Sequence, residues 1–130
     1  MRLVIDVSGV QPSTIKSGPT AWRTAITARA RDLYPDAPYT PAEGTTFKVE
    51  VEFRLVQQRL FTEPNWPPPP DLDNLLKPVL DTVFTSDNVV GPTAALVDRN
   101  DTYVSEVCAK KRRAETTREE GAVITVAWND

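Results

Sequence analysis

The alternation of residue types across residues 46–56, TFKVEVEFRLV, constrains the fold more than any other feature of the sequence. Apolar side chains occupy every second position: Phe47, Val49, Val51, Phe53 and Leu55. Because side chains of a strand point alternately to its two faces, this pattern predicts a strand with one buried face and one wet face. Such a strand is typical of an antiparallel or mixed sheet that helices cover on one side.

A first helix is predicted over residues 21–34. Thr20 stands directly before it and is a residue type that caps helices through its side-chain oxygen. The face expected to be buried carries Trp22, Ile26, Ala30 and Leu33, whereas Arg23 lies off that face.

A second helix is predicted to begin at Asp73, because apolar residues then recur in pairs every four residues: Leu75, Leu76, Val79, Leu80, Val83 and Phe84. Asp73, Lys77 and Asp81 follow one another at a spacing of four and are expected on the opposite, polar side. Four prolines at 67–70 precede this helix and predict a stiff, extended approach to it.

Further strands are predicted over residues 2–7, 94–98, 102–110 and 122–128 from their β-branched and aromatic content. A chain of 130 residues is long enough to bury roughly 65 to 70% of its unfolded surface in one core. We therefore predict one small α+β domain over residues 1–130, with a mixed or antiparallel sheet and two helices packed on one face.

The chain contains no histidine, so it lacks the commonest general base and the usual ligand of zinc, copper and nickel. A metal would have to be held by oxygen, which favours Mg²⁺, Mn²⁺ or Ca²⁺. The sequence has one cysteine, a net charge of -3 and no long apolar run, and these features predict a soluble, cytoplasmic protein without a membrane partner.

Two aspartates stand where the second helix begins. Capping of the helix is one explanation for Asp71 and Asp73, but capping needs only one carboxylate. Side chains at i and i+2 of an extended entry segment can instead converge on one divalent ion. Lys77, one turn further on, would either face a phosphate oxygen or form an ordinary i,i+4 pair with Asp73 and Asp81.

Two carboxylates rarely hold Mg²⁺ against water, so a third is needed. Asp98 and Asp101 are the candidates, since they flank a polar turn between two predicted strands. Taken alone, that turn is better explained by the turn chemistry of Asp and Asn.

The stretch PDLDNLLKPVLDTV resembles the signature of the RusA-type Holliday junction resolvases, which typically carry D-x-D-N-x-x-K-x-x-x-D at the start of a helix. A later family motif, an acidic pair followed by x-x-V and a basic residue, is similar to NDTYVSEVCAKK, where Asp101 takes the place of the second acid.

The resemblance implies a small homodimeric endodeoxyribonuclease that resolves four-way junctions and other branched DNA with Mg²⁺, for which Mn²⁺ can substitute. Asp71, Asp73 and Asp101 would be catalytic metal ligands and Lys77 the essential lysine. Asn74 would support the site by hydrogen bonding, and Asp98 would assist if Asp101 did not suffice.

Contact with DNA would rest on the basic run Lys110, Lys111, Arg112 and Arg113, which is otherwise explained as a solvated surface. Two other functions stay open. One is a noncatalytic binder of branched DNA, favoured by Asn100 in place of an acid and by the acidic net charge. The other is docking of a proline-recognising domain on WPPPP.

Overall fold

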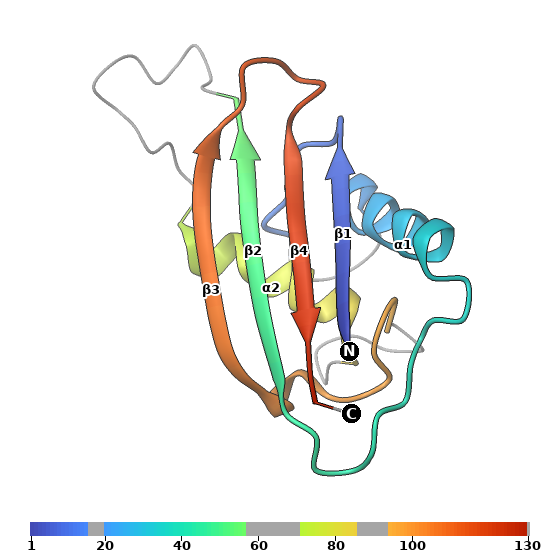
Figure 1. Cartoon of the computed structure of the whole chain (residues 1–130). Coiled ribbons are helices and arrows are strands. Elements are labelled where there is room, and N and C mark those ends of the chain that lie inside the picture. The colour runs from blue at the N-terminus through green and yellow to red at the C-terminus, as the bar shows by residue number, and fades with distance from the viewer. Residues whose placement is uncertain (16–19, 57–70, 86–93, 130) are drawn as a thin grey trace.

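The computed structural model describes residues 1–15, 20–56, 71–85 and 94–129. In chain order the elements are β1 (Arg2–Ser8), α1 (Ala21–Leu33), β2 (Phe47–Leu55), α2 (Leu72–Val83), the 3-10 turn η1 (Asp101–Tyr103), β3 (Val104–Arg113) and β4 (Gly121–Ala127). The four strands form one mixed sheet, and both helices lie behind the same face of it (Figure 1). The predicted α+β architecture is confirmed. The prolines at 67–70 lie outside the described residues.

The strand order of the sheet is β1-β4-β2-β3. β4 is antiparallel to both of its neighbours, whereas β3 is parallel to β2. Parallel strands need a crossover connection, and the chain between β2 and β3 supplies it with α2, which crosses the sheet from behind β3 to behind β1 (Figure 1). The start of α2 therefore lies at the β3 edge of the sheet.

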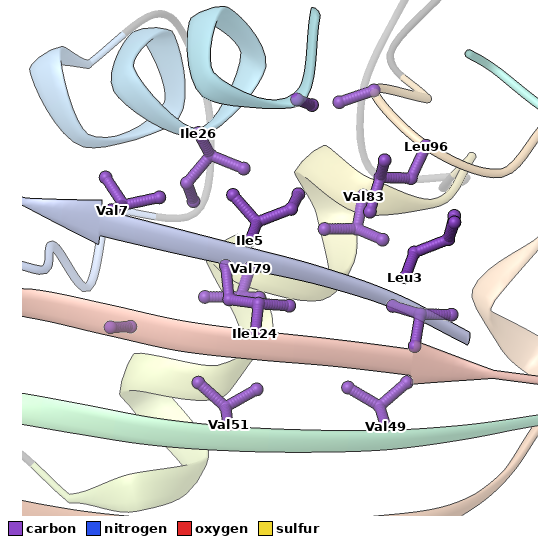
Figure 2. Packing of buried hydrophobic residues seen from close by; sticks show 14 of the residues in the cluster. Leu3, Ile5, Val7, Ile26, Val49, Val51, Val79, Val83, Leu96 and Ile124 are labelled. Atoms are coloured by element: carbon purple, nitrogen blue, oxygen red, sulfur yellow. The ribbon is translucent and has the colours of Figure 1, made fainter. Parts of the chain in front are cut away.

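The face of the sheet turned toward the helices forms the core. Side chains from β1, β4 and β2 point toward the helices and pack against side chains such as Ile26 and Val79 (Figure 2). β2 alternates as its sequence predicts, with all five apolar side chains buried. The opposite face of the sheet, here called the open face, is not covered by a described helix (Figure 1).

α1 starts where the sequence predicts, because the Thr20 hydroxyl accepts a hydrogen bond from the amide of Arg23 at 3.1 Å. Two expectations about its faces are wrong. Leu33 is 40% exposed at the end of the helix, and Arg23, expected off the buried face, is only 9% exposed. The side chain of Arg23 is buried because it points toward α2, where it meets the carboxylate of Asp81.

α2 starts at Leu72, one residue before the predicted start, and buries Leu75, Val79 and Val83 against the sheet. The expected polar face is only partly polar. Asp81 is 1% exposed, although the spacing placed it in line with Asp73 and Lys77 on the solvent side. Because α1 packs along α2 there, the last turn of α2 has protein on both sides.

The predicted strand at residues 94–98 does not form; only Val97 makes an isolated bridge, to Tyr39. The amides of Ala95 and Leu96 instead donate to the carbonyls of Thr82 and Val83, at 2.8 and 3.2 Å. This segment therefore donates hydrogen bonds to carbonyls at the C-terminal end of α2, which have no partner within the helix, and it does not extend the sheet.

β3 spans residues 104–113 rather than 102–110, since residues 101–103 form the turn η1. The basic run at 110–113 therefore belongs to a strand. None of the described helices is long and apolar enough to span a bilayer.

Candidate functional site

The two aspartates of the first motif lie at the start of α2, at the β3 edge of the sheet (Figure 1). Asp71 is the N-cap residue, with extended backbone angles, yet its side chain makes no capping hydrogen bond. Asp73 lies in the first turn, and both residues are exposed. Capping therefore does not account for the carboxylate of Asp71.

Asp101 of the second motif is brought to α2 by backbone contacts at the end of that helix. The amide of Asp101 donates to the carbonyl of Thr85 at 3.1 Å, and the amide of Thr85 donates to the carbonyl of Arg99 at 3.0 Å. The side chain of Asn100 caps η1 by accepting from the amide of Thr102 at 2.9 Å. These contacts fix the backbone on which Asp101 stands.

Lys77 joins the two motifs. Its ammonium nitrogen donates to Oδ2 of Asp101 at 3.2 Å and lies 3.2 Å from Oδ1 of Asp81. Burial by itself lowers the pKa of Lys77, but the carboxylates of Asp101 and Asp81 outweigh burial and raise that pKa above its ordinary value of 10.5. Lys77 is therefore positively charged at neutral pH, and it is held in place from two sides.

Asp81 is the functional candidate that the sequence interpretation missed. Its side chain is fully buried, and its Oδ2 lies 3.8 Å from Nη2 of Arg23 on α1. Neither carboxylate oxygen has a hydrogen bond of good geometry, so the charge is compensated by two nearby cations, Lys77 and Arg23. The available signals were the i,i+4 spacing to Lys77 and the match to the last acid of the resolvase signature.

The structure does not bring all the predicted metal ligands together. Within the described residues, no three acidic or sulfur side chains lie close enough to hold one ion. Asp98 is exposed, and its backbone amide bonds the carbonyl of Tyr39 at 2.8 Å. Asn74 is half-buried in α2, and its side chain makes no hydrogen bond to an aspartate among the described residues.

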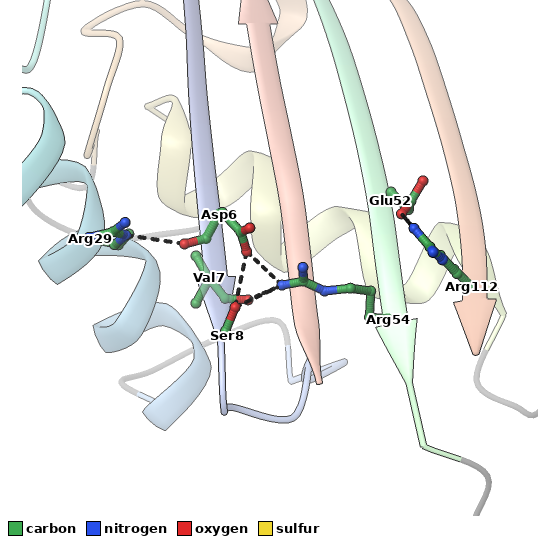
Figure 3. Close-up of polar contacts among 7 residues, drawn as sticks. All are labelled: Asp6, Val7, Ser8, Arg29, Glu52, Arg54 and Arg112. Carbon is green, nitrogen blue, oxygen red and sulfur yellow. Dashed lines mark hydrogen bonds and ion pairs between the residues drawn. The ribbon is translucent and has the colours of Figure 1, made fainter. Parts of the chain in front are cut away.

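The basic run of β3 is divided between the two faces of the sheet. Lys110 and Arg112 lie on the open face, where they pair with the carboxylate of Glu52 at 3.2 and 3.4 Å; the latter pair is drawn in Figure 3. The neighbouring Lys110, and then Arg112, lower the pKa of Glu52 below its ordinary value of 4.5. Lys111 and Arg113 lie on the other face, as the strand period requires. The run is therefore not one continuous basic surface.

The site places the charged ammonium group of Lys77 between a buried carboxylate, that of Asp81, and a partly exposed one, that of Asp101. Two exposed aspartates, Asp71 and Asp73, lie at the start of the same helix. No protein-family model, curated protein or solved structure matches this chain.

Proposed function

We propose that the chain is a magnesium-dependent, structure-specific endodeoxyribonuclease that resolves four-way junctions and other branched DNA by phosphodiester hydrolysis, acting as a cytoplasmic homodimer. The observation that carries the proposal is the contact between Lys77 and Asp101. These residues belong to the two separate stretches that resemble the resolvase motifs, 24 residues apart in sequence, and they meet at 3.2 Å. A chance match of either stretch would not require this contact.

In this proposal Asp71, Asp73 and Asp101 hold Mg²⁺, with Mn²⁺ as a substitute. The bound ion would generate the nucleophile from water and neutralise charge on the phosphate. The fit of the residues is partial. Asp71 and Asp73 are exposed carboxylates at one helix end, but Asp101 is engaged by Lys77 and no three-acid group is assembled among the described residues. To join Asp71 and Asp73 around one ion, Asp101 would have to give up its contact with Lys77 for a contact with that ion.

Lys77 supplies a fixed positive charge for a phosphate oxygen of the DNA backbone. A preorganised cation stabilises the charge that develops on phosphate without having to reorganise during the reaction. Asp81 limits the motion of Lys77 and, together with Asp101, raises the pKa of its ammonium group. The side chain of Lys77 is 34% exposed, so the ammonium group is accessible to a ligand while it is held.

A noncatalytic binder of branched DNA is the second candidate function, and one observation favours it. Lys77 already neutralises Asp101, the acid expected to complete the metal site. Asn100 stands where the resolvase motif has another acid, and its side chain caps η1. A protein with this arrangement would bind branched DNA without hydrolysing it.

Cleavage of a labelled four-way junction tests the proposal. The natural chain would be compared on the junction and on a linear duplex of matched sequence, with Mg²⁺ and with chelator. The variant is Asp73→Asn, and the matched control is Asp36→Asn, which removes one exposed carboxylate beyond the end of α1. We expect Mg²⁺-dependent nicks on the junction for the natural chain and the control. We expect Asp73→Asn to cut at least about 100-fold more slowly, since it loses metal-based catalysis.

Junction binding without cleavage by the natural chain would favour the noncatalytic binder. Cleavage that survives Asp73→Asn or persists in chelator would contradict the proposed site. Titration of Mn²⁺ followed by its electron paramagnetic resonance signal gives a second readout: ion binding by the natural chain should be weakened in Asp73→Asn and unchanged in Asp36→Asn.

A further inference from the structure

The sheet ends at β1 on one side and at β3 on the other, and an edge strand turns part of its backbone groups away from the sheet. On β1 these groups are covered by side chains of α1 and its C-cap. The hydroxyl of Tyr34 accepts from the amide of Val4 at 2.8 Å and donates to the carbonyl of Val4 at 3.2 Å. Nε of Arg29 donates to the carbonyl of Asp6 at 3.2 Å (Figure 3). The β1 edge is therefore closed to another strand at these residues.

The outward groups of β3 can be identified from its pairing with β2. The amide of Ala114 donates to the carbonyl of Leu55, which is the register partner of Arg113. In a parallel pair a residue bonds the two residues that flank its partner, so Ala114 and every second residue before it turn their backbone groups toward β2. Val107 and Ala109 therefore turn theirs away from the sheet, and no hydrogen bond joins these groups to another described residue.

The side chains at the middle of the β3 edge are also accessible. Val107 is 44% exposed, although its register partner Val49 is buried in the core. Cys108, on the opposite face of the strand, is exposed as well. An edge with free backbone groups and an exposed apolar residue at its centre is suited to the addition of a further strand.

β3 is complementary to itself in one antiparallel register. When Cys108 lies opposite Cys108 of a second copy, a two-fold axis passes between them. Glu106 then lies opposite Lys110 of the second copy, and Val107 lies opposite Ala109 of the second copy. Pairs of opposite charge and pairs of apolar residues are the cross-strand neighbours that stabilise a sheet.

The ion pairs within each copy extend this charge pattern and do not have to break. Glu106 lies 3.7 Å from Lys48 of β2, and Lys110 lies 3.2 Å from Glu52 of β2. Across the joined edge, the row Lys48, Glu106, then Lys110 and Glu52 of the second copy alternates in sign. Each of the two central charges thereby gains a second partner of opposite charge.

Other registers lose part of this complementarity. Sliding one strand by two residues leaves Glu106 opposite Cys108 in one direction, and Val107 opposite Lys111 in the other. Sliding it by one residue would place the helices of the two copies on opposite faces of the joined sheet. The register centred on Cys108 is therefore favoured.

From this complementarity we infer that the protein dimerises through the β3 edge, where β3 of a second copy adds antiparallel and joins the two sheets into one. Val107 and Ala109 would exchange backbone hydrogen bonds with Ala109 and Val107 of the second copy. The inference gives the homodimer of the proposed function its interface and rests on that function in this respect. Because the two-fold axis is perpendicular to the joined sheet, both α2 helices lie on one face of the dimer, and both pairs of Asp71 and Asp73 can meet one branched DNA.

The single cysteine of the chain tests the register. Opposed residues that do not exchange backbone hydrogen bonds have Cα atoms about 4.5 Å apart, which a disulfide can span. Diamide takes up the two thiol hydrogens as the disulfide forms, and we expect it to convert the natural chain to a covalent dimer. The control is Cys108→Ser with Glu50→Cys, which moves the only thiol to the paired position on β2. There the two thiols would be roughly 14 Å apart, so we expect cross-linking at least about tenfold slower.

Charge reversal gives a second test that does not depend on sulfur. In Glu106→Lys and in Lys110→Glu, like charges oppose each other across the axis, so each variant alone should dimerise at least about tenfold more weakly in analytical ultracentrifugation. A mixture of the two variants restores opposite charges at both positions and should dimerise like the natural chain. Glu50→Lys changes the net charge as Glu106→Lys does, and we expect its dimerisation to stay within about threefold of the natural chain. Thermal melts establish that every variant is folded.

Three results would overturn the inference: a natural chain that stays monomeric, a mixture that dimerises no better than its components, or equal rates of cross-linking from positions 108 and 50. Cleavage of the junction in Mg²⁺ is scored separately. If the natural chain cuts the junction but fails these tests, the inference is wrong and the proposed nuclease function stands. If it passes them but neither binds nor cuts the junction, the interface stands and the proposed nuclease function is wrong.

Discussion

At the scale of single residues, the most unusual feature of this protein is the fully buried carboxylate of Asp81. Burying a charge is costly unless other charges and hydrogen bonds compensate for it. Here the compensation comes from Lys77 on the same helix and Arg23 on α1, so the carboxylate links the two helices. The same charge holds the ammonium group of Lys77 beside Asp101.

Asp81→Asn tests this role. The amide keeps the shape of the side chain but leaves Lys77 and Arg23 without their buried counter-charge, so we expect the free energy of unfolding to fall by about 2 to 3 kcal/mol. Urea denaturation measures the change, with Asp36→Asn as an exposed control expected within about 0.5 kcal/mol of the natural chain. A stability equal to that of the control would mean that the attraction of Asp81 to Lys77 and Arg23 only offsets the desolvation cost of burying its charge.

At the scale of elements, the sequence predicts best where the pattern is local. β2 was predicted because its period of two depends only on its own residues, and the start of α1 because the cap Thr20 bonds three residues ahead. Residues 94–98 were mistaken for a strand because their amides bond α2, an interaction that composition does not reveal. The burial of Asp81 and the contact of Lys77 with Asp101 likewise depend on partners 58 and 24 residues away in sequence.

The ion pairs that join neighbouring strands predict a dependence of stability on pH. Because Lys110 and Arg112 lower the folded-state pKa of Glu52 below 4.5, this group stabilises the fold above the unfolded pKa and loses that effect as pH falls through the folded-state pKa. We expect Glu52→Gln to remove at most about 1 kcal/mol at pH 7, since both basic partners are largely exposed.

Urea denaturation from pH 7 down to pH 3 measures this contribution as the difference between the natural chain and Glu52→Gln, which should shrink toward zero in acid. Glu50→Gln is the matched control, because Glu50 lies on the same face of β2 and forms no ion pair with a described residue. A difference that stays constant with pH would show that the charge of Glu52 is not what stabilises the strand pair.

At the scale of the whole molecule, the sheet holds the site together. β4 lies between β1 and β2 and pairs antiparallel with both. It thereby joins β1, which precedes α1, to β2, which precedes the part of the chain that carries the site. β2 then aligns β3 in parallel, and β3 positions both η1 and the basic residues beside α2. Asp101 is thus held between β3, which follows η1 directly, and the backbone contacts at Thr85 just beyond α2.

Gly121, the first residue of β4, is where this register can be tested. It pairs with Ser8 and Arg54 on its two neighbours, and its φ of +146° disfavours any residue with a side chain. A Cβ atom there would lie 1.8 Å from the carbonyl oxygen of Val7, which is backbone and cannot swing aside. Gly121→Ala would thus push β1 away from β4, and we expect it to cost at least about 3 kcal/mol of unfolding free energy.

Gly44→Ala is the matched control, because Gly44 also has a positive φ, +86°, while a Cβ there would meet no atom within 4 Å. It shows what a Cβ costs at a positive φ where it meets no other atom, which we expect to be about 1 to 2 kcal/mol. Urea denaturation of both variants shows how much more the substitution costs at Gly121, where the clash with Val7 and the less favourable φ act together. If the two variants were equally stable, β1 would not approach Gly121 this closely, and the pairing of β1 with β4 would have to differ from the register described. A larger loss of stability in Gly121→Ala, together with weaker junction binding, would show that the site at α2 depends on the pairing of β1 with β4 at the other side of the sheet.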